Sequence, residues 1–214
     1  MRAKLLEFLP LAMLAACAWS QDSVTVAVPA TANIFAAGQS SAFSGTLPPT
    51  VAFPAGSVAS VQLQALGRVT LGGGEPYAGP AGIPFHGGTD LTTYNGLSGI
   101  IAHDRGFFLT GVFLDDSTPA GIGPPPIDFT GAENFLTLSP LLFQTFFIGN
   151  GGSGPAPPAP KTFFVPAGAT RLFLGIADGC LLALGPPGCY EDNTGWFMAE
   201  VLLAPSPHAQ AKTR

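Results

Sequence analysis

Side chains that carry oxygen gather in two short segments near the end of the chain. Asp178 directly follows an apolar run, and Asp192 and Asn193 stand together just before the apolar run that begins at Trp196. Carboxylate and carboxamide oxygens suit a hard cation such as calcium, which takes roughly six to eight oxygen ligands at about 2.3–2.6 Å. The pattern predicts a calcium site built from two loops that flank the last strand. An ordinary Asp-Asn-Thr-Gly hairpin turn is the alternative interpretation.

Two cysteines lie in the same stretch, on either side of Gly185-Pro186-Pro187-Gly188. In an oxidising compartment Cys180 and Cys189 are expected to form a disulfide. The closed loop would reduce the entropy lost when the oxygen ligands are ordered. A pair of buried free thiols is the alternative interpretation.

No motif of a known catalytic type accompanies these residues. The three histidines occur outside nucleophile-elbow or zincin contexts; they are His86, His103 and His208. A solvated turn is expected at His103-Asp104, because adjacent side chains on a strand point to opposite faces. We expect a non-catalytic protein. An enzyme that uses carboxylates scattered along loops, such as Asp90, Asp115 and Asp128, remains a further interpretation.

The N-terminus has the organisation of an export signal. Arg2 and Lys4 precede an apolar stretch from Leu5 to Ala16, which is too short for a transmembrane helix. Cleavage just before Gln21 is one expectation, and lipidation of Cys17 after Leu14-Ala15-Ala16 is the other. Either way we expect a secreted, periplasmic or cell-surface protein without a transmembrane segment.

Composition favours a β-sheet protein. Charged residues make up 10% of the chain, with 28 Gly, 22 Pro and 17 Phe, so turns are frequent, charged helix faces are scarce and a large core is possible. The net charge of −5 argues against nucleic acid as a partner.

Apolar runs between Gly and Pro residues predict nine strands in a single β-sandwich domain over residues 21–205, followed by a disordered tail over 206–214. The expected strands are Ser23–Val28, Thr50–Phe53, Ser57–Ala65, Gly99–Ala102, Phe107–Leu114, Phe143–Ile148, Lys161–Val165, Thr170–Ile176 and Trp196–Leu203. Long loops are expected at 118–126 and 149–160, and one helical turn within 134–142.

The segment from Phe164 to Asp178, followed by Pro187 to Gly195, resembles the C-terminal half of the PA-IL-like bacterial galactophilic lectins. The match lies mainly within residues 161–203. The resemblance implies a calcium-dependent, galactose-binding β-sandwich of jelly-roll type. It also implies a set of calcium ligands, namely the side chains of Asp178, Asp192 and Asn193 and the backbone carbonyls of Cys189 and Leu71.

The same resemblance nominates residues for the sugar. Thr92 and Asn95 stand where these lectins contact the sugar, Asp192 would bond its hydroxyls, and Tyr190 or Trp196 would cover its apolar face or pack in the core. The chain differs in having Asp192 in place of an amide and Thr92 in place of a histidine. We therefore expect an exported calcium-dependent lectin for a galactose-type glycan. A structural or adhesive surface protein, with a calcium-clamped or metal-free loop, is the alternative.

Overall fold

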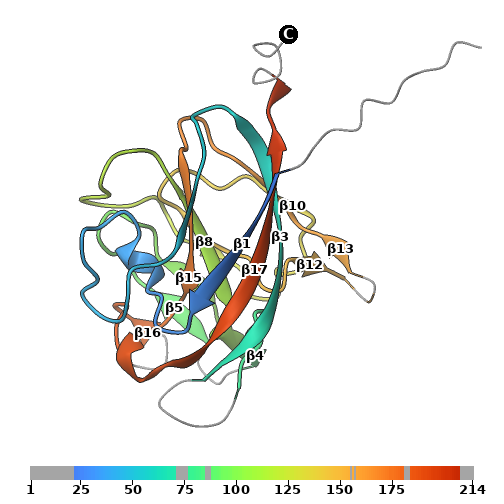
Figure 1. Cartoon of the computed structure of the whole chain (residues 1–214). Helices are drawn as coiled ribbons and strands as arrows, with labels where there is room; N and C mark the ends of the chain where they lie inside the picture. The colour runs from blue at the N-terminus through green and yellow to red at the C-terminus, as the bar shows by residue number, and fades with distance from the viewer. Residues whose placement is uncertain are drawn as a thin grey trace, which may run out of the picture.

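The computed structural model describes residues 22–70, 77–84, 88–154, 156, 158–180 and 184–207. The predicted signal peptide, the lipidation candidate Cys17 and the ligand candidate Leu71 lie outside these residues. Two larger sheets form the body of the molecule (Figure 1). Together with several smaller sheets they confirm the prediction of an all-β sandwich-type fold.

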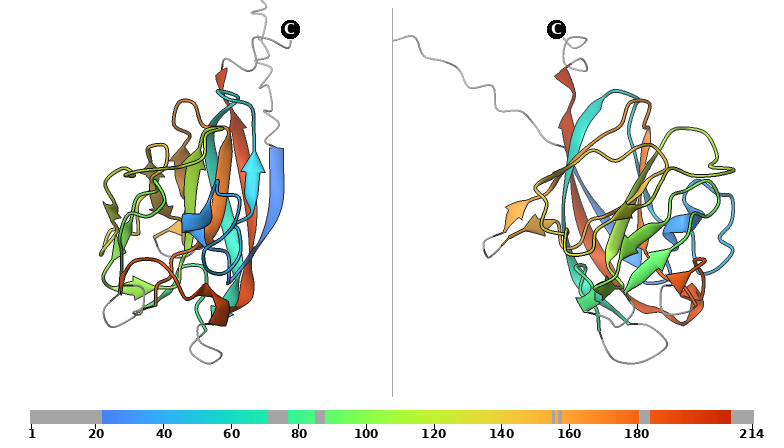
Figure 2. Two further views of the ribbon diagram at one scale, coloured as in Figure 1. Left: turned by 90° about the vertical axis from the view of Figure 1, so that its left-hand side faces the viewer. Right: turned by 180° about the vertical axis from the view of Figure 1, so that it is seen from behind.

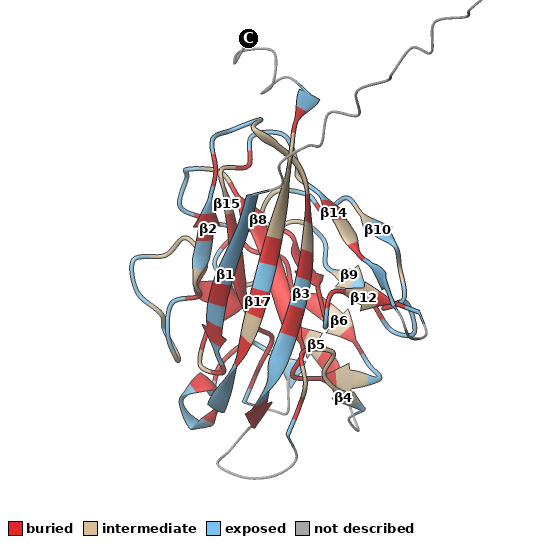
Figure 3. Ribbon diagram, turned by 45° about the vertical axis from the view of Figure 1, so that its right-hand side comes forward, coloured by how far each residue is buried: buried red, intermediate tan, exposed pale blue. Residues whose placement is uncertain are grey.

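The first sheet has five strands in the order β1-β17-β3-β14-β10. The strands are β1 (Asp22–Pro29), β17 (Thr194–Pro205), β3 (Val58–Thr70), β14 (Thr162–Phe164) and β10 (Thr137–Leu138). The long strand β17 pairs antiparallel with both β1 and β3. Its side chains alternate between the two faces, with Phe197, Ala199 and Val201 buried, so the sheet has one dry and one wet face. Figure 3 shows this alternation along the ribbon.

The second sheet has four strands in the order β11-β8-β15-β2. The strands are β11 (Thr145–Phe147), β8 (Leu109–Leu114), β15 (Arg171–Ile176) and β2 (Thr50–Ala52). Every residue of β8 is buried, as expected for a central strand. Figure 2 shows this sheet lying against the first. Aromatic rings join the two layers, for example Phe146 of β11 and Phe163 of β14, whose ring centroids are 5.0 Å apart.

Short elements border these sheets. A third sheet has the order β16-β5-β6-β9, with β16 (Leu184–Gly185), β5 (Thr89–Leu91), β6 (Ile100–Ala102) and β9 (Ile127–Asp128). Two small pairs are β12 (Gly152–Ser153) with β13 (Ala159–Pro160) and β4 (Ile83–Pro84) with β7 (Arg105–Gly106). Two 3₁₀ turns are η1 (Ile34–Ala36) and η2 (Tyr190–Asp192).

All nine expected strands coincide with observed ones, with ends that shift by a few residues. The helical turn expected within 134–142 is wrong, because Thr137 and Leu138 pair with β14 as strand β10. The expected loop 149–160 contains the small β12–β13 pair. His103 and Asp104 lie in an exposed turn between β6 and β7, as expected.

The C-terminal segment is ordered slightly further than expected. Ser206, assigned to the tail, is buried, and its backbone N–H and hydroxyl donate to the carbonyls of Ser57 and Gly56. Residues 208–214 lie outside the described residues. Across the part of the chain that the structure describes, no helix has the length and apolar character needed to span a membrane.

Candidate functional site

Asp178 follows β15 at one end of the sandwich and is only 4% exposed. Its Oδ1 accepts a hydrogen bond of 2.7 Å from the backbone N–H of Gly179. Its Oδ2 accepts one of 2.7 Å from Nδ2 of Asn193, the residue that precedes β17. The structure thus brings together two of the predicted calcium ligands from two different segments.

Asn193 is also buried, and its amide is only partly satisfied. Its Nδ2 donates to Asp178 and to the carbonyl of Ala30 at 3.3 Å. Its Oδ1 is the one buried side-chain nitrogen or oxygen without a hydrogen-bond partner among the described residues. Because an unpaired buried polar atom costs about 1–3 kcal/mol, the Oδ1 of Asn193 is a candidate ligand for a cation.

Electrostatics at this position disfavour a bare negative charge. Burial is the largest effect and raises the pKa of Asp178 to about 7, against the hydrogen bonds from Asn193 and Gly179 that lower it. The exposed carboxylate of Asp192 raises this pKa further. A divalent cation bound here would stabilise the ionised form of Asp178.

A disulfide joins Cys180 to Cys189, with 5.0 Å between their Cα atoms. Gly179 forms an isolated β-bridge with Pro187, and the backbone N–H of Gly188 donates to the carbonyl of Asp178 at 3.3 Å. The segment between the two cysteines therefore folds back, so that Pro187 and Gly188 contact the backbone of Gly179 and Asp178. Cys189 is exposed and has a left-handed backbone with a φ of 61°, which turns the chain into η2.

Tyr190 is a core residue that contacts the backbone of Asp178 and does not face solvent. It is fully buried, its hydroxyl accepts from the backbone N–H of Asp178 at 3.1 Å, and it donates to the carbonyl of Ile176 at 2.9 Å. The interpretation of Tyr190 as a ring that covers a sugar is therefore wrong. The cause is the segment around Ser44 and Gly45, which packs over its backbone and Cβ.

Glu191 is a residue of this region that sequence reasoning missed. Its two carboxylate oxygens accept from the hydroxyl of Ser44 at 2.9 Å and the backbone N–H of Gly45 at 3.0 Å. These bonds lower the pKa of Glu191, the backbone bond from Gly45 being the largest cause. They fasten η2 to a loop far away in the sequence. The Tyr-Glu-Asp run pointed to this position only as part of a turn.

The predicted sugar-contacting residues lie on separate segments of the chain. Thr92 lies beside the Gly185 corner, because its backbone N–H and hydroxyl donate to the carbonyl of Gly185 at 2.9 and 3.4 Å. Asn95 is exposed in a tight turn with a φ of 49°, and none of the hydrogen bonds described links it to Asp178. Trp196 is 61% exposed on β17, so it, unlike Tyr190, presents an aromatic surface to solvent.

Within the described residues, no three His, Cys, Asp or Glu side chains converge as a metal site would require. The candidate site contains two carboxylates, those of Asp178 and Asp192, and the carboxamide of Asn193. No family model matches the chain, and neither a curated protein nor a solved structure does. The resemblance to PA-IL-like lectins therefore stays a prediction.

Proposed function

We propose that the loops around Asp178 and Asn193 bind calcium and, through it, a carbohydrate. One observation carries the proposal: a buried carboxylate lies beside a buried carboxamide whose oxygen has no partner. Both groups are oxygen donors, as calcium requires. In the structure Asn193 turns its Nδ2 toward the carboxylate, and rotation of the amide would offer the unpaired Oδ1 instead.

Two further proposed ligands lie in the segment before β17. Asp192 would supply a second carboxylate, and the Cys189 carbonyl lies in the disulfide-closed segment that leads into η2. The disulfide and the Glu191 hydrogen bonds limit the movement of that segment. Ordering of the ligands therefore costs less entropy on binding than it would in an open loop.

Calcium bound here would leave coordination positions that two neighbouring sugar hydroxyls can fill. Thr92 lies near the loop, with its side chain exposed. Trp196 follows Asn193 by three residues and has the exposed aromatic surface that sugar faces favour. These residues are the proposed glycan contacts, together with the exposed Asn95 that the resemblance nominates, and the expected partner is a galactose-type glycan.

A structural role without metal is the second candidate. It is favoured by the hydrogen bonds that Asn193 already makes to Asp178 and Ala30, because they tie the end of β15 to β17 without an ion. In this case the protein would be a surface or adhesive module, and neither calcium nor sugar would change its stability.

Calorimetric titration of calcium into the chelated and desalted protein separates the two candidates. We expect saturable binding by the wild type and at least about tenfold weaker binding by Asp178→Asn, because a carboxylate ligand is lost. Asp128→Asn is the matched control, since Asp128 is exposed and caps only its own turn. Equal calcium affinity in wild type and Asp178→Asn would refute the proposed metal site.

The carbohydrate step needs its own measurement. Titration of galactose and of neutral control sugars should give heat only in the calcium-loaded wild type, and Trp196→Ala should weaken that binding. Sugar binding that persists after calcium is removed would contradict a calcium-mediated mechanism. Calcium binding without any sugar response would contradict the carbohydrate step and favour a structural protein whose loop is clamped by calcium.

A further inference from the structure

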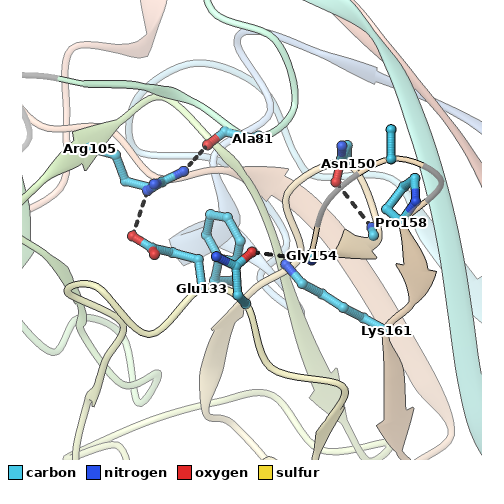
Figure 4. A pocket seen from close by; sticks show the side chains of 11 residues that line it. Ala81, Arg105, Glu133, Asn150, Gly154, Pro158 and Lys161 are labelled. Atoms are coloured by element: carbon cyan, nitrogen blue, oxygen red, sulfur yellow. Dashed lines mark hydrogen bonds and ion pairs between the residues drawn. The ribbon is translucent and has the colours of Figure 1, made fainter.

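A cavity of about 370 Å³ lies apart from the Asp178 loops and shares no residue with them. Figure 4 shows its lining side chains. They come from sequence segments that are far apart, namely the segment before β4, strands β7 and β11, the loop before β10, and the stretch of chain in and around the β12–β13 pair. The volume suits a ligand of monosaccharide size.

Lys161 is the unusual residue of this cavity. It is 2% exposed, and its Nζ donates a single hydrogen bond, to the carbonyl of Ile148 at 3.2 Å. The same Nζ lies 4.4 Å from the centroid of the Phe147 ring and 4.7 Å from that of Phe135. No carboxylate among the described residues lies within 4.0 Å of it. An ammonium has three N–H donors, so two remain for a ligand.

The charged side chains that line the cavity are Arg105, Glu133 and Lys161. Arg105 pairs with Glu133 through a 2.6 Å contact, lies 3.7 Å from the exposed carboxylate of Asp104, which does not line the cavity, and donates to the carbonyl of Ala81 at 2.9 Å. Both ion pairs involve Arg105, so Lys161 is the lining cation without a carboxylate in contact among the described residues. Only four Lys or Arg residues occur in the described part of this acidic chain, and two of them line this one cavity.

Two asparagines at the rim present further donors. Asn150 accepts from the backbone N–H of Gly152 at 3.0 Å through its Oδ1, and Asn134 accepts from that of Gly154 at 3.5 Å through its Oδ1. Because the side-chain oxygens already accept from backbone N–H groups, the amide NH₂ groups remain as hydrogen-bond donors. Both residues are exposed, so these donors are accessible from solvent.

From these observations we propose that the cavity binds a small molecule bearing a carboxylate, with the Lys161 ammonium as its charge partner. The rim amides of Asn134 and Asn150 donate to the remaining oxygens, and the Phe147 ring forms an apolar wall. A single ammonium without a carboxylate in contact fits a monoanion better than a phosphate dianion. The site is independent of calcium.

A carboxylate of this size has two sources, a free organic acid or the uronate residue of an acidic glycan. A neighbouring cavity of about 370 Å³ shares Asn150, Gly152 and Pro158 with the first. This neighbouring cavity has room for the part of a larger ligand that extends beyond its carboxylate-bearing ring. The shared chemistry is the carboxylate, and the experiment separates the sources.

The test is calorimetric titration in calcium-free buffer from which the chelator has been removed, because chelators themselves carry carboxylates. Glucuronate and galacturonate are compared with glucose and galactose, which differ only at the acid group, and with lactate as a free acid. We expect the uronates to bind at least about tenfold more tightly than the neutral sugars. Lactate binding as tight as that of the uronates would identify free acids as the source.

Variants show whether the binding is at this cavity. Lys161→Met keeps the bulk of the side chain and removes the charge, and we expect about 10- to 100-fold weaker uronate binding. Asn134→Ala changes an exposed rim residue and should weaken binding several-fold without affecting folding. Arg68→Met, on the exposed part of β3, is the matched control. Equal uronate affinity in wild type and Lys161→Met, or equal affinity for acidic and neutral sugars, would overturn the proposal.

Discussion

Asn193 donates a 2.7 Å hydrogen bond to the buried carboxylate of Asp178, and this contact joins the end of β15 to the start of β17. The two strands belong to different sheets of the sandwich. The pair therefore closes one end of the fold as well as forming the centre of the candidate site. A ligand that binds here would act on the packing of both sheets.

The first prediction concerns the hydroxyl beneath this pair. Tyr190→Phe leaves the backbone N–H of Asp178 and the carbonyl of Ile176 without their partner. We expect a loss of about 1–3 kcal/mol in the free energy of unfolding, measured by urea denaturation. Tyr77→Phe is the control, because Tyr77 is half exposed. Identical unfolding curves for the two variants would show that the buried hydroxyl contributes nothing.

The second prediction concerns Gly45, which has a φ of +69°. A β-carbon there would lie 2.3 Å from the carbonyl oxygen of Thr31 and 2.4 Å from Cβ of Tyr190. Gly56 has a similar φ of +71° but open space around it. Gly56→Ala should therefore cost about 1–2 kcal/mol from backbone strain alone, and Gly45→Ala should cost clearly more.

Thermal melting of both glycine variants checks this difference. Calcium titration adds a second readout, since displacement of Tyr190 would disturb the backbone N–H of Asp178. A Gly45→Ala protein as stable as Gly56→Ala would mean that the loop over η2 can move away at little cost.

The third prediction concerns the Cys180–Cys189 disulfide, whose cysteines are 9 residues apart. Closing a loop of this length restricts the unfolded chain, and the loss of the bond should cost about 2–3 kcal/mol. The double variant Cys180→Ser, Cys189→Ser is compared with wild type by urea denaturation under oxidising conditions. Addition of a reducing agent should lower the wild type to the level of the variant and leave the variant unchanged.

The fourth prediction concerns pH and Lys161. Burial lowers the pKa of Lys161 from 10.5 to about 8, with the nearby Arg105 lowering it further and Glu133 opposing this. Between pH 8 and 10.5 the unfolded chain thus binds more protons at this residue than the folded protein does. The contribution of Lys161 to stability should rise with pH across this window, by up to about 3 kcal/mol.

The difference in unfolding free energy between wild type and Lys161→Met isolates this contribution from other titrating groups. It should be largest in favour of the variant below pH 8 and shrink toward pH 10. Carboxylate binding at the cavity should weaken over the same rise in pH, because the neutral amine lacks the charge. A difference that is constant from pH 7 to 10 would contradict the lowered pKa.

Sequence reasoning succeeded where the information is local. The alternation of apolar and polar residues in β3 and β17 reports directly which face of a strand is dry. The short strands β4, β7 and β12 were not predicted, because the formation of a two-residue strand depends on which partner segment lies beside it. Residues Thr137 and Leu138 form a strand for the same reason, since β14 supplies the pairing that their own sequence does not specify.

By itself, then, the sequence determined the all-β class, the main strands and the presence of oxygen donors on either side of the last loop, because hydrophobic periodicity and turn residues act over a few positions. Only the tertiary structure decided that Tyr190 is buried while Trp196 is exposed, since that depends on the distant Ser44–Gly45 segment covering η2. It also enclosed Lys161 between Phe135 and Phe147. Burial of a side chain is set by everything that packs around it, and those neighbours come from the whole chain.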